Sequence, residues 1–247
     1  MTTSRGTLAI IQARMRSTRL PGKVLADLGG ASALARVVNR TRRSSLVTQV
    51  VVATSTILAD EAIVNECASL DVPCFRGSED DVLDRYYQAA RYYAAESVVR
   101  ITADCPVLDP GLLDELISAF LNTACDYGSN ALPPRYPRGL GAEIFTGEAL
   151  SRAWQNANQA YQRVHVTPYF YQNTHLFRLL CVVGKTDHSH HRWTLDTAED
   201  LALIRSIYSR FQNRDDFSWE EVLELVEREP QLSKINCHVL QKQLQEC

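Results

Sequence analysis

The sequence has no long apolar run and no excess of basic residues. No stretch approaches the roughly 20 consecutive apolar residues that a membrane-spanning helix requires, and residues 1–6 lack the apolar segment of a signal peptide. The 26 lysine and arginine residues are offset by 29 aspartate and glutamate residues, which leaves a net charge of −3. This balance does not provide the basic field that drives nucleic-acid binding. We therefore expect a cytoplasmic protein that binds neither membranes nor nucleic acid.

Cysteine is present without the spacing that a disulfide framework or a zinc site requires. The chain has seven cysteines, an odd number, and none forms a C-x-x-C pair. Most stand in apolar or helical contexts, where a free cysteine behaves as a small hydrophobic residue. The pattern indicates reduced thiols. Residues 187–191 contain three histidines, but their spacing matches no compact zinc site and is more typical of a polar loop.

The order of apolar and amphipathic segments predicts an α/β fold. At 247 residues, the chain is long enough for one large domain with its own core. Short apolar runs alternate with amphipathic ones, as is typical of βαβ units. The expected strands are 7–12, 49–54, 73–76, 97–102, 140–145 and 176–183. The expected helices are 33–44, 58–70, 81–95, 110–122, 147–158, 161–172, 197–211 and 218–229. We expect a doubly wound, mostly parallel sheet, with the loops after the strands at one edge.

A cation-rich loop follows the first expected strand. Residues 12–23 read Gln-Ala-Arg-Met-Arg-Ser-Thr-Arg-Leu-Pro-Gly-Lys. Gly22 lets the backbone approach a phosphate, the arginines supply planar forks and Lys23 supplies a mobile point charge. A nucleoside triphosphate is therefore the expected ligand, and a solvated basic loop is the alternative. The loop is not a Walker A motif, because the G-x-x-x-x-G-K-[ST] spacing is absent.

One aspartate, Asp104, stands where a magnesium ligand is expected, and a second, Asp196, lies in a later acidic segment. Asp104 follows an apolar strand, which places it at the ligand-binding edge of the sheet, and Mg²⁺ is typically held by one or two carboxylates with substrate phosphates. From the residues alone, Asp104 could equally cap the helix that starts near Pro110. Asp196 lies in the segment Trp-Thr-Leu-Asp-Thr-Ala-Glu-Asp. There, Asp196 or Thr197 could instead be the N-cap of the following helix.

The motif at residues 12–23 resembles the signature of the cytidylyltransferases that make CMP-activated sugar acids. Within that family it is most similar to the spore-coat polysaccharide branch, a relative of the acylneuraminate and 3-deoxy-manno-octulosonate enzymes. The resemblance covers roughly residues 7 to 211 and implies a Rossmann-like, nucleotide-diphospho-sugar transferase-like fold. In these enzymes an aspartate before x-Pro and the first aspartate of Trp-Thr-Leu-Asp form the metal site. The resemblance thus implies Mg²⁺ bound by Asp104 and Asp196.

The implied reaction joins CTP to a 2-keto-3-deoxy sugar acid, giving a CMP-sugar and pyrophosphate by in-line attack of the anomeric hydroxyl. Arg14, Arg19 and Lys23 would neutralise the triphosphate and the departing pyrophosphate. The expected nucleotide-binding residues are Gln12, Ala13, Arg14, Ser17, Thr18, Arg19, Gly22, Lys23, Thr54, Ser78 and Asp81. Of these, Ser78 and Asp81 also read as the capped start of a helix.

The sugar acid needs a cation for its carboxylate and polar partners for its hydroxyls. Arg138 is expected to supply the cation, and Tyr136, Glu143 and His165 the polar partners. The alternative is an interior histidine and a surface ion pair. Two positions depart from the branch: Arg16 stands where glycine is usual, and Gly141 where aspartate is common. The sugar specificity is therefore left open.

Three other functions share part of this sequence pattern. A glycosyltransferase of similar fold normally has an Asp-x-Asp motif, which this chain lacks. A sugar-1-phosphate nucleotidyltransferase usually has a glycine-richer first loop. A non-catalytic sugar-nucleotide binding protein would lose the metal carboxylates, yet Asp104 and Asp196 are both present.

We assign residues 1–234 to one domain and expect 235–247 to be a peripheral tail. The stretch 128–141 is rich in proline and is expected to be a long loop at the active site or an interface. This loop, together with the dimeric state that the family resemblance implies, predicts a homodimer.

Overall fold

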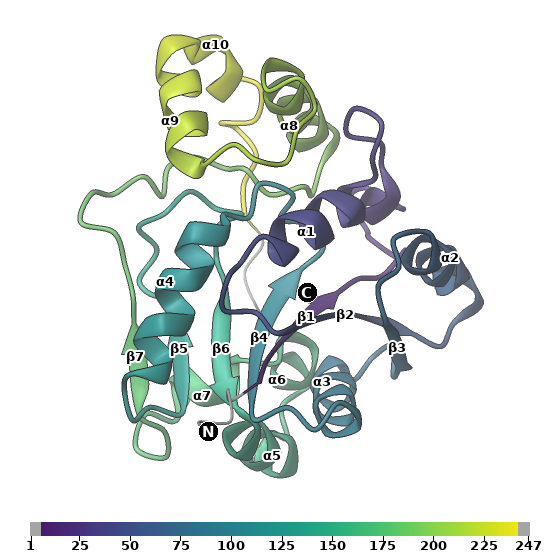
Figure 1. Cartoon of the computed structure of the whole chain (residues 1–247), viewed down its shortest axis with the longest axis vertical. Coiled ribbons are helices and arrows are strands. Elements are labelled where there is room, and N and C mark those ends of the chain that lie inside the picture. The colour runs from purple at the N-terminus through teal and green to yellow at the C-terminus, as the bar shows by residue number, and fades with distance from the viewer. Residues whose placement is uncertain (1–5, 242–247) are drawn as a thin grey trace.

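A seven-stranded sheet forms the centre of the computed structural model, which describes residues 6–241 (Figure 1). The strand order is β3-β2-β1-β4-β6-β5-β7. The strands are β1 (Thr7–Gln12), β2 (Gln49–Ser55), β3 (Cys74–Gly77), β4 (Ser97–Thr102), β5 (Tyr127–Ser129), β6 (Glu143–Thr146) and β7 (Leu179–Cys181). Only β6 runs antiparallel to its neighbours among these strands. The expected mostly parallel α/β sheet is confirmed.

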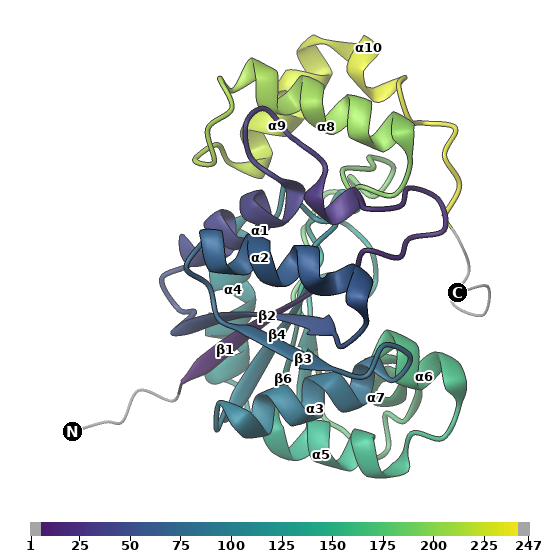
Figure 2. The same cartoon turned by 90° about the vertical axis from the view of Figure 1, so that its right-hand side faces the viewer.

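Helices cover both faces of this sheet (Figure 2). Residues of β1 alternate between two cores, with Ile11 packing against α1, α2 and α4 and Ile10 against α3, α5 and α7. The helices are α1 (Ala33–Arg42), α2 (Glu61–Ser69), α3 (Val82–Tyr92), α4 (Pro110–Leu121), α5 (Gly147–Asn156), α6 (Ala160–His165), α7 (Pro168–Gln172), α8 (Ala198–Arg210), α9 (Trp219–Arg228) and α10 (Pro230–Ser233). Two 3₁₀ turns are η1 (Lys23–Leu25) and η2 (Leu58–Asp60). A third core joins α8, α9 and α10 to Trp193.

The register of the central strands brings their carboxyl ends level. Gln12, the last residue of β1, pairs with Ala53 of β2 and Thr102 of β4. The loops that follow β1 and β4 therefore leave the same edge, which is where open α/β sheets bind ligands. Within residues 6–241, no helix is long and apolar enough to cross a membrane.

Several expected elements differ from the structure. The stretch 128–141 was expected to be entirely loop, but Gly128 and Ser129 belong to β5. A Cβ at Gly128 would lie 3.2 Å from the Phe120 ring, so tertiary packing favours glycine in this strand. The expected helix 161–172 is two short helices, because Val166 has a φ of 72° and Pro168 starts a new turn.

The tail expected to be peripheral is attached to the body of the protein. Asn236 is buried, and its side chain donates hydrogen bonds to Arg192 and Asp200. Gln241 contacts the guanidinium of Arg192. These contacts could not be predicted from the sequence, because the partners of Asn236 lie 44 and 36 residues away along the chain. Residues 242–247 lie outside the described part.

Candidate active site

A cavity of about 750 Å³ opens at the carboxyl edge of the sheet. Its walls come from the loop after β1, the end of β4, the connection between β5 and β6, and the segment before α8. Most of the predicted site residues line it: Gln12, Ala13, Arg14, Ser17, Thr18, Arg19, Lys23, Asp104, Tyr136, Arg138, Glu143, His165 and Asp196. The remaining four, Gly22, Thr54, Ser78 and Asp81, are not among its lining residues.

The loop after β1 is folded back by a hydrogen bond near its end. The amide of Gly22 donates to the carbonyl oxygen of Met15 at 2.9 Å, and Gly22 has a φ of 72°. This left-handed conformation favours glycine. It turns the chain so that Lys23, the first residue of η1, directs its ammonium into the cavity.

A buried carboxylate holds the same loop from the side of β2. Asp60 accepts hydrogen bonds from the Met15 amide at 2.8 Å, from Thr54 Oγ1 at 3.0 Å and from the Ser55 amide at 3.1 Å. Burial opposes ionisation, but bonds from Ser55, Met15 and Thr54 keep the pKa of Asp60 below its ordinary value. Thr54, predicted to face the nucleotide, thus donates to Asp60 instead.

Ser78 and Asp81 form the capped helix start that the residues themselves suggested. Asp81 accepts from the Asp84 amide at 2.8 Å and pairs with Arg163 at 2.5 Å, and Ser78 accepts from the Asp81 amide at 3.0 Å. Arg16, one of the departures from the branch, is exposed and pairs with Glu79 at 3.2 Å. Arg16 also lines the cavity, where Glu79 partly neutralises its charge.

Asp104 and Asp196 converge on the ammonium of Lys23. The Lys23 Nζ lies 2.6 Å from Oδ2 of Asp104 and 2.7 Å from Oδ1 of Asp196. Burial lowers the pKa of Lys23, but the two carboxylates more than offset this and raise it. Arg19 Nη2 and Arg192 Nη2 contact Asp196 at 2.8 and 2.7 Å. Although burial opposes it, these cations hold the pKa of Asp196 at about 2.

Other residues cap the two helices that Asp104 and Asp196 were considered to cap. Asp109 caps α4 by accepting from the Leu112 amide, and Thr197 caps α8 by accepting from the Asp200 amide. The side chains of Asp104 and Asp196 therefore do not serve as helix N-caps. Their loops are joined directly, because the Leu195 amide donates to the carbonyl oxygen of Asp104 at 2.8 Å.

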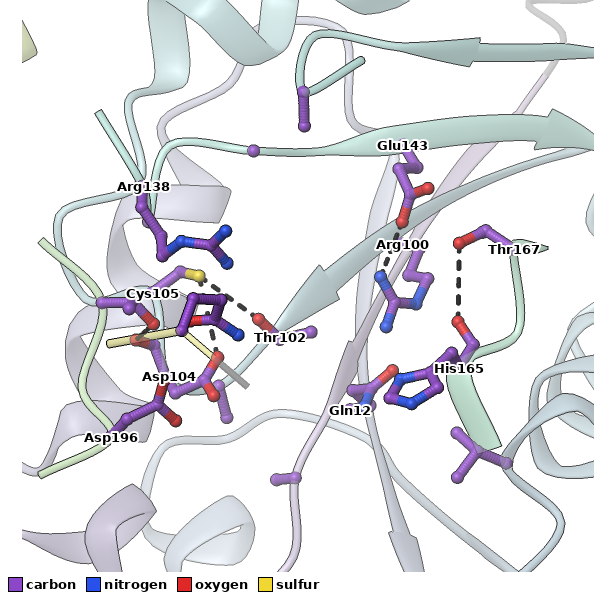
Figure 3. A pocket seen from close by; sticks show the side chains of 18 of the residues that line it. Gln12, Arg100, Thr102, Asp104, Cys105, Arg138, Glu143, His165, Thr167 and Asp196 are labelled. Atoms are coloured by element: carbon purple, nitrogen blue, oxygen red, sulfur yellow. Dashed lines mark hydrogen bonds and ion pairs between the residues drawn. The ribbon is translucent and has the colours of Figure 1, made fainter. Parts of the chain in front are cut away.

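The polar residues of the cavity fall into two groups (Figure 3). Arg138 lies on the side of Asp104 and Asp196, and no ion pair within residues 6–241 neutralises it. Burial, followed by repulsion from Arg192, lowers the pKa of Arg138. A cation destabilised in this way favours an anionic ligand.

On the other side lie Gln12, Arg100, Glu143 and His165 (Figure 3). Arg100 Nη1 contacts Glu143 Oε2 at 2.6 Å, and Tyr127 donates to the second oxygen at 2.5 Å. Both the Oε1 of Gln12 and the Nε of Arg100 are buried, and neither has a hydrogen-bond partner among residues 6–241. Buried polar atoms without partners are costly, so this group has donor and acceptor capacity left for a polar ligand.

Sequence reasoning missed Arg100, Asp60 and Arg192. An arginine inside the apolar run Val98–Thr102 was a signal for Arg100, because a half-buried strand rarely carries a charge without a partner. Asp60 had no comparable signal, since its contact with the Met15 amide joins residues 45 apart. Arg192 contacts Asp196 within the same segment, but its contact with Gln241 joins residues 49 apart.

An open α/β sheet with a cation-rich loop facing two carboxylates at its carboxyl edge defines a nucleotidyltransferase. The family model for cytidylyltransferases matches residues 8–242. The chain belongs to this family, whose substrate is CTP. The resemblance drawn from residues 12–23 is confirmed.

Individual relatives agree with this assignment. The spore coat polysaccharide biosynthesis protein SpsF of Bacillus subtilis is 36% identical over 234 residues, which cover 90% of this chain and 95% of the relative. The 3-deoxy-manno-octulosonate cytidylyltransferase of Trichlorobacter lovleyi is 36% identical over 116 residues, 46% of this chain and 44% of that enzyme. The solved structure of a cytidylyltransferase from Leptospira borgpetersenii has a TM-score of 0.87 at 32% identity, covering 92% of this chain and 95% of that one.

Proposed function

We propose that this protein transfers CMP from CTP to the anomeric hydroxyl of a 2-keto-3-deoxy sugar acid, releases pyrophosphate and serves cell-surface polysaccharide or glycoconjugate biosynthesis. The observation that carries the proposal is the convergence of Asp104 and Asp196 on Lys23 at the end of the cationic loop. The similarity to the spore coat protein and to the 3-deoxy-manno-octulosonate enzyme supports the acceptor class.

The triphosphate is assigned to the loop after β1. Arg14, Arg19 and Lys23 line the cavity within ten residues of one another, and together they neutralise the triphosphate and the departing pyrophosphate. Because phosphoryl transfer needs little covalent help from the protein, positioning and charge stabilisation account for most of the catalysis.

A magnesium ion fits the carboxylate pair. Lys23 Nζ contacts one oxygen of Asp104 and one of Asp196 at 2.6 and 2.7 Å, so a positive charge is already accommodated between them. No group of three or more His, Cys, Asp or Glu side chains in the described part of the chain is placed to hold a metal. Two carboxylates completed by phosphate oxygens and water are a usual set for Mg²⁺. When bound, the ion supplies charge neutralisation and a lower pKa for the attacking hydroxyl.

The sugar acid is assigned to the part of the cavity beyond the α-phosphate. Arg138 pairs with its carboxylate, and Glu143 and His165 bind its hydroxyls, with Tyr136 at the wall. Gly141 leaves the pocket without the carboxylate common in the branch, and a Cβ there would lie 3.1 Å from the Cβ of Ala131. The acceptor is therefore one whose hydroxyls do not require that carboxylate.

A covalent route through the cavity cysteine is disfavoured. Burial, followed by repulsion from Asp104, raises the pKa of Cys105 to about 12. The thiol is therefore protonated at neutral pH and is a poor nucleophile. Direct in-line attack by the acceptor hydroxyl is the simpler path.

Pyrophosphate release tests the proposal. The protein is incubated with Mg²⁺, each of the four ribonucleoside triphosphates in turn, and a panel of 2-keto-3-deoxy sugar acids, with sugar 1-phosphates as the competing acceptor class. We expect release only with CTP and a sugar acid. Release with UTP or GTP and a sugar 1-phosphate would instead identify a sugar-1-phosphate nucleotidyltransferase, and no release under any condition would reject an enzymatic role with these acceptors.

A further inference from the structure

The carboxyl-terminal segment reaches the active site through two side chains. Asn236 is buried, and its Nδ2 donates to the carbonyl oxygen of Arg192 and to Oδ1 of Asp200, each at 2.8 Å. The Oε1 of Gln241 accepts from Nη1 of Arg192 at 2.8 Å, and Gln241 lines the cavity. The segment therefore contacts both the backbone and the guanidinium of Arg192.

Arg192 directs the rest of its guanidinium at two carboxylates. Its Nε and Nη2 donate to the two oxygens of Asp200, both at 2.9 Å, and Nη2 also donates to Asp196 at 2.7 Å. Asp200 is fully buried and accepts from the Asp196 amide at 3.0 Å. A bidentate pair fixes geometry as well as charge. Arg192 and Asp200 thus hold the Asp196 carboxylate together with Lys23 and Arg19, which also contact it.

We propose that Asn236 and Gln241 are positioning residues of the active site, which orient Arg192 so that it holds the Asp196 carboxylate in place for the nucleotide and its metal. The inference rests on the proposed function, because that function gives Asp196 its role. Asn236 is suited to this position because its uncharged Nδ2 has two N–H donors, one for the carbonyl oxygen of Arg192 and one for the carboxylate of Asp200. Gln241 is exposed, whereas the other residues of the arrangement, Asp196, Arg192, Asp200 and Asn236, are buried.

Because Gln241 is exposed, it can be substituted with little effect on the stability of the fold. Gln241→Ala removes an acceptor from Arg192 without touching the core, and Leu240→Ala is the matched control because Leu240 is 86% exposed and adjacent. Asn236→Ala tests the buried contact, with its melting temperature followed separately. Binding of Mn²⁺ together with CTP is measured directly, by electron paramagnetic resonance of free Mn²⁺ and by calorimetry, alongside steady-state turnover.

Loss of a residue that orients a metal ligand typically lowers metal affinity or activity by about 10- to 100-fold. We expect Asn236→Ala to raise the Kd for Mn²⁺–CTP within that range, and Gln241→Ala to raise it by several-fold, with the KM for the sugar acid and the melting temperature of Gln241→Ala unchanged. Leu240→Ala should match the wild type.

A Gln241→Ala protein that binds Mn²⁺–CTP as tightly as Leu240→Ala overturns the inference, even if Asn236→Ala is less stable. Such a result leaves the proposed function standing, because the wild type still binds and reacts. If the wild type itself fails to bind CTP in the presence of Mn²⁺, the proposed function fails, and that outcome is read from the wild type alone.

Discussion

The carboxylate of Asp196 contacts three cationic groups, so Asp196→Asn separates its chemical role from its structural one. Its oxygens lie 2.7 Å from Lys23, 2.8 Å from Arg19 and 2.7 Å from Arg192. Asparagine keeps the shape of the side chain and removes the charge. Loss of metal-borne and electrostatic stabilisation in the transition state is expected to lower kcat by at least about a hundredfold. Asp104→Asn should lower kcat by a similar factor.

The structural cost of Asp196→Asn follows from the pKa. The pKa of about 2, against an ordinary 3.8, corresponds to roughly 2 kcal/mol of stability at neutral pH, at about 1.4 kcal/mol per pKa unit. Because the folded-state pKa is lowered, this contribution is fully present above pH 3.8 and is lost as the pH falls through about 2. We therefore expect the variant to unfold more easily at neutral pH and the difference from the wild type to shrink in acid.

The assay combines pyrophosphate release at saturating CTP and acceptor with thermal unfolding followed by circular dichroism. Asp187→Asn, which changes an exposed loop carboxylate, is the control and should alter neither quantity. If Asp196→Asn keeps a near-normal kcat and loses only stability, the carboxylate serves the local fold, and its assignment to the reaction is refuted.

Three other predictions concern metal, acceptor and assembly. EDTA should abolish turnover, because two carboxylates and a triphosphate form an oxygen-only metal site. Full activity in chelator without added metal would contradict the assignment of Asp104 and Asp196 as metal ligands. Arg138→Ala should raise the KM for the sugar acid by roughly one to two orders of magnitude, as expected for losing a charge-assisted pair of about 1.5 to 3 kcal/mol, with little change for CTP; equal changes in both KM values would assign Arg138 to the nucleotide. Light scattering should give the mass of a homodimer, and a monomer at micromolar concentration in physiological salt would rule that out.

Continuous apolar runs and linear motifs were readable from the sequence, whereas contacts between distant loops were not. The strands at 7–12 and 97–102 were predicted to the residue because each is a mostly apolar run bounded by polar residues. The approach of the Lys23 loop to the Asp104 loop followed from the parallel sheet, and the place of Asp196 followed from the family resemblance. The direct contact of Lys23 with both carboxylates was not predicted. By contrast, the contact of Asp60 with the Met15 amide, 45 residues away, could not be predicted from the sequence, and the helix break at Val166 depends on one backbone angle.

The reversed direction of β6 has a geometric consequence for the breadth of the catalytic edge. In the antiparallel pair with β4, Glu143 at the beginning of β6 lies opposite Arg100, near the end of β4. If β6 were parallel to β4, the connection from β5 would have to cross to the opposite edge of the sheet, and only the loop after β6 would lie at the ligand-binding edge. Because β6 runs backwards, the connection that enters it from β5, residues 130–142, opens on the same side as the loops that leave β1 and β4. The inverted strand therefore keeps this connection, with Arg138, at the edge of the sheet where the cavity lies.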